Sequence, residues 1–177
     1  MKKLILGSAI AAVLGVASSA MAAPNTGTVN FTGSVSTATC DLSLKDNNGA
    51  DISSINLGVL SSSATTNGTA VPFKLVPTDN ACLTKASANV AWSSPTLAAA
   101  GINNATNGGT NAYLLLSATN ANQTGNNALI KQGQTSFDYS AQAGIKSFDY
   151  SAVLAKPTAA LTAGPFSASA SYIVTYK

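Results

Sequence analysis

The sequence predicts an all-β protein of short strands, arranged as a sandwich or a barrel. Turn signals recur along the chain as the runs Asn47-Asn48-Gly49, Asn67-Gly68, Asn107-Gly108-Gly109 and Gly125-Asn126-Asn127. Asn and Gly tolerate the positive φ that tight turns require. Short runs rich in β-branched and aromatic residues lie between these signals, and no stretch after residue 22 has a long helical period.

Residues 1–22 have the pattern of a cleaved signal peptide. Lys2 and Lys3 precede an apolar run, and Ala20-Met21-Ala22 supplies the small residues that signal peptidase requires at −3 and −1. The run is shorter than the roughly 20 residues of a membrane-spanning helix. We therefore expect an exported chain whose mature part, from residue 23, is one domain.

The expected strands follow one another along the mature chain. The first extended stretch, 26–44, changes parity near 36–39, which indicates a bulge or a break. Pro72 and Pro77 indicate that the strand at 71–76 lies at a sheet edge or ends there. The remaining strands are expected at 55–59, 89–93, 112–118, 136–141, 148–154 and 166–176.

A six-residue segment occurs twice. Ser-Phe-Asp-Tyr-Ser-Ala at 136–141 recurs at 147–152. A repeated ligand-binding motif is one interpretation, but two copies do not make a repeat array. We favour two similar strands that both point Phe and Tyr inward.

The last fourteen residues alternate strictly in polarity. Ser, Thr and Lys occupy one face, with Ile173 as the apolar exception. Since successive side chains of a strand point to opposite faces, this segment is a half-buried strand that needs neighbours. The other face carries Phe166, Ala168, Ala170, Tyr172, Val174 and Tyr176.

Cysteine content and charge narrow the function. Cys40 and Cys82 are an even pair in an exported chain, which predicts a structural disulfide. The chain lacks His, Glu and Arg, so the usual general acid–base and metal-ligating residues are missing. Without Lys2 and Lys3, seven lysines face six aspartates, and this near-neutral balance is a poor basis for nucleic-acid binding. We predict no enzymatic activity and no cofactor or metal.

Both ends of the mature chain carry a family pattern. Gly164 is fourteenth from the end and Tyr176 is penultimate, while Val174, Tyr172 and Ala170 are fourth, sixth and eighth. The N-terminal segment is Gly27-Thr28-Val29-Asn30-Phe31-Thr32-Gly33. With the spacing of the two cysteines, these residues resemble a pilin of the chaperone–usher pathway. The resemblance covers nearly all of residues 25–177 and is closest to major subunits of enterobacterial fimbriae that bind host sialoglycolipids.

The resemblance implies an immunoglobulin-like sandwich that lacks its seventh strand. The C-terminal strand, from Gly164 to Tyr176, would border the resulting groove in the pilin domain, 33–177. A periplasmic chaperone would insert a strand there and would be displaced at an outer-membrane usher by the next identical subunit. That subunit would contribute its donor segment, 23–32, and repetition would give an adhesive fimbria on the cell surface. The residues implied in the donor role are Asn25, Gly27, Val29 and Phe31.

Three points stay open at this stage. In an isolated chain, the donor segment is expected to be either detached or folded back on its own groove. The chain is alternatively an adhesin or lectin subunit, with Lys131, Lys146 and Lys156 as candidate contacts to a host sialoglycolipid. A small outer-membrane β-barrel would need about eight strands of 9–11 residues, and several expected strands are too short.

Overall fold

The computed structural model describes residues 27–33, as backbone, and residues 40–177. The predicted signal peptide, Asn25 and the predicted break at 36–39 lie outside the described residues. The elements in chain order are β1 (Gly27–Gly33), β2 (Leu42–Asp46), β3 (Ile55–Asn56), β4 (Val71–Pro77), α1 (Asn80–Leu83), β5 (Ser87–Ser93), β6 (Ile102–Asn103), β7 (Tyr113–Ala118), the 3-10 helix η1 (Gly125–Ala128), β8 (Ser136–Ser140), β9 (Phe148–Ala155) and β10 (Phe166–Tyr176).

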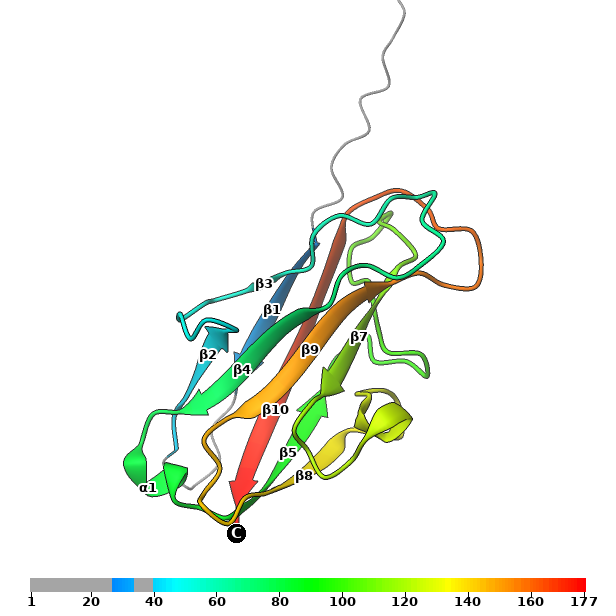
Figure 1. The fold of residues 1–177 in the computed structure, drawn as a ribbon. Coiled ribbons are helices and arrows are strands. Elements are labelled where there is room, and N and C mark those ends of the chain that lie inside the picture. Colours follow the sequence, from blue (N-terminus) through cyan, green and yellow to red (C-terminus); the bar gives the residue numbers. More distant parts are fainter. Residues whose placement is uncertain (1–26, 34–39) are drawn as a thin grey trace, which may run out of the picture.

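The strands form two sheets that pack face to face (Figure 1). Sheet A has the strand order β3-β1-β10-β5-β8, and sheet B has the order β2-β4-β9-β7-β6. Among the strands of the described residues, β1 and β10 run parallel and every other pair is antiparallel. The predicted all-β, immunoglobulin-like sandwich is confirmed.

The two copies of the repeated segment face each other across the core. Phe137 and Tyr139 lie on β8 of sheet A, Phe148 and Tyr150 lie on β9 of sheet B, and all four side chains are buried. The rings of Tyr139 and Phe148 meet edge to face with centroids 4.8 Å apart. The interpretation of two inward-facing strands is therefore confirmed. Burying an aromatic side chain stabilises the fold by about 1.5–3 kcal/mol, so the repeated segment serves to fill the core.

Local structure differs from the sequence prediction in three places. β3 has two residues instead of the expected 55–59, because the chain turns at Gly58, where φ is +73°, and Leu57 and Leu60 reach the core from a loop. The strand expected at 71–76 is β4, which ends at Pro77 as one of the two alternatives predicted. The other alternative, an edge position, is wrong, because β4 lies inside sheet B between β2 and β9. Pro72 is tolerated there because it lies beyond the last residue that pairs with β2.

Helix α1 is the third difference, since the sequence analysis did not predict it. Asp79 begins this short helix by accepting a hydrogen bond from the Ala81 amide at 2.7 Å. Cys82 of α1 forms the predicted disulfide with Cys40, with the two Cα atoms 6.0 Å apart. This bond fixes the chain just before β2 to α1, at one end of the sandwich. No helix of the described residues is long and apolar enough to cross a membrane.

Candidate functional site

The candidate site is the edge of β10 that faces β1 and β3. On its other edge, β10 pairs with β5 over residues 171–176. On the candidate edge it pairs in parallel with β1 over residues 166–172. β1 in turn pairs with β3 through Thr28 and Val29. The backbone of the predicted donor residues Gly27, Val29 and Phe31 therefore lies in a folded-back position beside its own β10 (Figure 1).

β1 fills a slot that no other described strand occupies. β3 belongs to sheet A only through β1. Without β1, sheet A would end at β10, and the backbone N–H and C=O groups along that edge would lose their partners. An edge of this kind accepts an added strand from another chain.

The inward-facing side chains of β10 change from buried to half-buried along the strand. Phe166, Ala168 and Ala170 are at most 4% exposed, which matches the predicted alternation. Tyr172, Val174 and Tyr176 are half-buried. The change follows the register, because β1 ends opposite Tyr172 and the last four residues of β10 have no described strand beside them on that edge. Ile173, the apolar exception, points outward and is 49% exposed.

Core aromatic rings form the floor beneath the C-terminal half of β10. The Tyr172 ring lies 5.4 Å from the Trp92 ring, and the Tyr176 ring lies 6.1 Å from the Phe148 ring. Burial raises the pKa of Tyr172, and it raises the pKa of Tyr176 to about 12. Among the described residues, Tyr176 carries the one buried side-chain oxygen that has no hydrogen-bond partner. This end of the edge is thus an apolar surface with one polar atom to satisfy, which suits an extended peptide.

A hydrogen-bonded group of aromatic side chains joins the two sheets under this floor. Trp92 of sheet A donates from Nε1 to the Tyr150 hydroxyl of sheet B at 3.2 Å, and the Tyr139 hydroxyl donates to the same oxygen at 2.8 Å. Burial raises the pKa of Tyr139 and Tyr150 well above the usual tyrosine value, so both hydroxyls stay protonated and neutral. The floor is therefore held by contacts that do not involve β1.

Gly164 lies directly before β10, where two backbone segments touch. Its φ is +149°, a conformation that L side chains rarely adopt. A Cβ atom on Gly164 would lie 2.8 Å from the Thr110 nitrogen and 2.9 Å from the Gly109 carbonyl carbon. The loop before β7 therefore holds the start of β10 by direct backbone contact, and glycine is required for it.

Similarity to known proteins decides the family. No family model matches the chain. The chain is 39% identical to the K99 fimbrial protein of Escherichia coli over 165 residues, which span 88% of this chain and 89% of that protein. It is 33% identical to the F107 fimbrial protein of Escherichia coli over 181 residues, spanning both chains completely. The chain belongs to the fimbrial protein family. It is exported to the cell surface, where fimbrial proteins polymerise into fibres.

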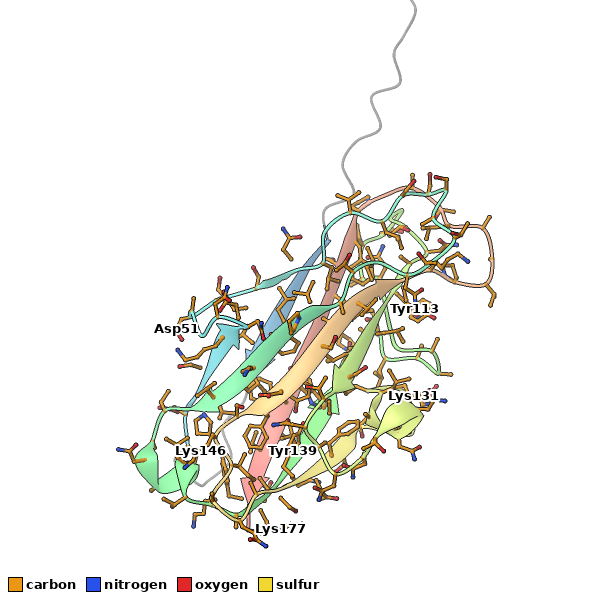
Figure 2. The ribbon with its side chains drawn as sticks, in the orientation of Figure 1. Asp51, Tyr113, Lys131, Tyr139, Lys146 and Lys177 are labelled. Atoms are coloured by element: carbon orange, nitrogen blue, oxygen red, sulfur yellow. A yellow bond between two sulfur atoms is a disulfide. The ribbon has the colours of Figure 1, made fainter. Side chains whose placement is uncertain are left out.

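The lysines predicted to contact a glycan do not form one site in the fimbrial protein. Lys146 and Lys156 lie before and after β9, an eight-residue strand that spans roughly 26 Å. Lys131 lies beside η1, apart from Lys146 (Figure 2). Lys146 borders a pocket of about 210 Å³ with Asn120 and Ser147, and its Nζ donates to the Leu83 carbonyl at 2.9 Å. Glycan binding by any one of them stays a prediction.

Metal binding has no support in the described part of the fimbrial protein. No three Asp or Cys side chains there lie close enough together to hold an ion. The candidate site is thus the backbone edge of β10 together with the half-buried side chains of its C-terminal half. Sequence reasoning identified β10, Gly164 and the N-terminal segment. It missed Asn104 and Ser94, whose side chains bond the backbone of β10, because both are ordinary polar residues.

Proposed function

We propose that this fimbrial protein is a structural subunit, of the major type, that polymerises by donor-strand exchange. In the fibre, the N-terminal segment of one subunit would occupy the slot along β10 of its neighbour. The observation that carries the proposal is the place of β1. It is the N-terminal strand, it runs parallel to β10, and it fills a slot between β10 and β3 that the rest of the described chain leaves free.

The exchange is physically economical because it replaces contacts within one chain by similar contacts between identical chains. Backbone hydrogen bonds along β10 would give affinity, and alternate side chains would set the register. Burial of Val29 and Phe31 in the groove would contribute about 1.5–3 kcal/mol each. Gly27 would lie where the groove has no room for a side chain. Since the contact is head to tail and does not close on itself, repetition gives a fibre.

Delivery before exchange needs a partner that covers the groove. An uncovered strand edge with apolar side chains is prone to aggregate. β1 accompanies β10 only to Tyr172, so the half-buried residues Val174 and Tyr176 extend past it. A periplasmic chaperone strand that runs along the whole of β10 would cover this end too. An outer-membrane usher would then be the place where the next subunit displaces the chaperone.

The donor role is tested by removing residues 23–31 and expressing the chain with its chaperone and usher. We expect the deleted chain to bind the chaperone in a pull-down and to form no fibres by electron microscopy. Fibres assembled from the deleted chain would contradict the proposal.

A matched pair of variants tests the parity of the donor strand. V29D/F31D places two charges on the side predicted to enter the groove, whereas T28D/N30D places them on the opposite side. We expect fibres from the second variant and none from the first. Equal assembly of both variants would exclude the proposed register.

A further inference from the structure

The two halves of β10 are held differently on the edge away from β1. Residues 171–176 pair with β5, which ends at Ser93 opposite Ser171. Residues 166–170 extend past that end, so on this edge no described strand lies beside them. They are instead bonded by Ser94, in the loop after β5, and by residues 104–106, in the loop after β6.

Asn104 makes the central contacts of this arrangement. Its Oδ1 accepts from the Ser167 amide at 3.0 Å, and its Nδ2 donates to the Pro165 carbonyl at 2.9 Å. The same side chain also donates to the Thr110 carbonyl at 2.8 Å and accepts from the Thr106 amide at 3.0 Å. Four hydrogen bonds are the full capacity of an amide side chain. Asn104 therefore has one orientation, and that orientation fixes the start of β10.

Two neighbours complete the contact along the same edge. The Ala105 amide donates to the Ser167 carbonyl at 2.7 Å. The Ser94 Oγ donates to the Ser169 carbonyl at 2.7 Å. We call Asn104, Ala105 and Ser94 the loop clamp. It satisfies the amide and carbonyl of Ser167 and the carbonyl of Ser169 in place of a strand.

The loop clamp leaves the opposite edge of β10 free for another strand. Backbone groups of successive strand residues point to alternate edges. Since Ser167 and Ser169 point to the loop clamp, Phe166, Ala168 and Ala170 point to the slot where β1 lies. An isolated strand is not stable without neighbours. When β1 leaves, the loop clamp is the remaining in-plane support of residues 166–170 among the described residues.

We propose that Asn104, assisted by Ser94, is a positioning residue that keeps the N-terminal half of β10 extended while the slot is empty. The inference rests on the proposed function, since it concerns the interval between release of one strand and capture of the next. A preformed edge spares an incoming strand the entropy of ordering its acceptor. Loss of the loop clamp should therefore weaken strand capture more than it weakens the sandwich.

The test uses the chain from Ala23 to Lys177 with its own β1 disabled by V29P. β1 has a strand on both sides, so a proline at 29 removes a ladder hydrogen bond whichever neighbour that amide faces. The probe is a fluorescein-labelled peptide of residues 23–33, and its Kd is measured by fluorescence anisotropy. N111A is the matched control, because Asn111 also bonds loop backbone, at Ala160 and Thr162, without contacting β10.

We expect N104A to raise the Kd of the peptide at least about tenfold, because several hydrogen bonds are lost at once. N111A should change the Kd less than about twofold. Each variant loses two bonds to loop backbone, but only N104A also loses bonds to Pro165 and Ser167. S94A removes one bond to β10 and should lie between them. Equal Kd values for N104A and N111A would overturn the proposal.

Amide hydrogen exchange in the chain with unaltered β1 gives a second readout, which does not depend on peptide binding. S94A and N104A should lower the protection of residues 166–170 and leave that of 171–176 unchanged. Uniform loss over both halves, or no loss, would overturn the positioning role even if N104A folds poorly. Should the peptide fail to bind V29P with Asn104 intact, the donor-strand proposal fails, while the exchange experiment still decides the role of the loop clamp.

Discussion

The two sheets of the sandwich are completed in different ways. Sheet B uses strands from residues 42–155 only, and each pairs antiparallel with its neighbours. Sheet A needs β1, which comes from the N-terminal side of the disulfide at Cys40 and pairs in parallel with β10. All strands of sheet B thus come from one continuous stretch of chain, whereas sheet A includes a strand from outside that stretch. Under the proposed donor-strand exchange, sheet B would maintain the fold and β1 of sheet A would be the strand that exchanges.

The largest expected effect on stability comes from a substitution that creates a cavity beside sheet B. Leu114 is fully buried on β7, opposite Leu154 of β9, and L114A should lower the free energy of unfolding by about 2–5 kcal/mol. Urea unfolding followed by Trp92 fluorescence measures it. V59A serves as the control, because Val59 is 62% exposed and should change the stability by less than about 0.5 kcal/mol.

The same substitution also tests the separation of the two sheets. If sheet B does not depend on β1, L114A should lower the stability by the same amount in the V29P chain, because independent sites are additive. A much smaller loss in the V29P chain would mean that β1 supports sheet B as well, and would break the comparison.

The positions of most strands and the disulfide could be predicted from the sequence. Strict alternation placed β10 and its inward face correctly, because a period of two leaves few other possibilities. Turn signals and apolar runs located the strands β4, β5, β7, β8 and β9 to within a few residues. The disulfide between Cys40 and Cys82 was predicted because an exported chain with two cysteines meets an oxidising compartment.

What the sequence did not reveal depends on contacts between distant residues. β3 is short because Leu57 and Leu60 enter the core from a loop, which period-two reasoning cannot detect. Asn104 looks like any other residue of an Asn-rich chain, and only its four hydrogen bonds distinguish it. The sequence also left open whether the N-terminal segment is detached or folded back, because both arrangements use the same side chains.

An intermediate effect is expected at the start of β10. G164A introduces a Cβ against Gly109 and Thr110 and forces alanine into a φ of +149°, so we expect a loss of about 1–3 kcal/mol in unfolding free energy. The control is G133A, where φ is +80° and no atom lies within 4 Å of the added Cβ. G133A therefore reports conformational strain alone.

Peptide capture should separate these two glycine variants more clearly than stability does. G164A shifts the first residues of the accepting edge in sheet A, whereas Gly133 lies in the turn before β8. We expect weaker capture of the 23–33 peptide by G164A and unchanged capture by G133A, both in the V29P chain. Equal capture would mean that the backbone contact at Gly164 serves the fold and not the edge.

The smallest expected effect concerns Tyr176, at the end of β10 that β1 does not reach. Its hydroxyl is buried without a hydrogen-bond partner among the described residues, so Y176F should change stability near pH 8 by less than about 0.5 kcal/mol. The effect should appear in alkali. A tyrosine is neutral while protonated, and burial raises the pKa of Tyr176 to about 12, whereas an unfolded chain titrates near 10.

The folded chain therefore retains this proton over a pH range in which the unfolded chain loses it. The stabilising contribution is fully present below about pH 10 and is lost as the pH rises towards about 12. Y176F lacks this proton, so its stability should decline less steeply than that of the unaltered chain over the same range, as measured by urea unfolding at several pH values. Parallel declines would show that the Tyr176 hydroxyl is hydrated in the folded chain, and that this end of β10 is open to water where an incoming strand would have to displace it.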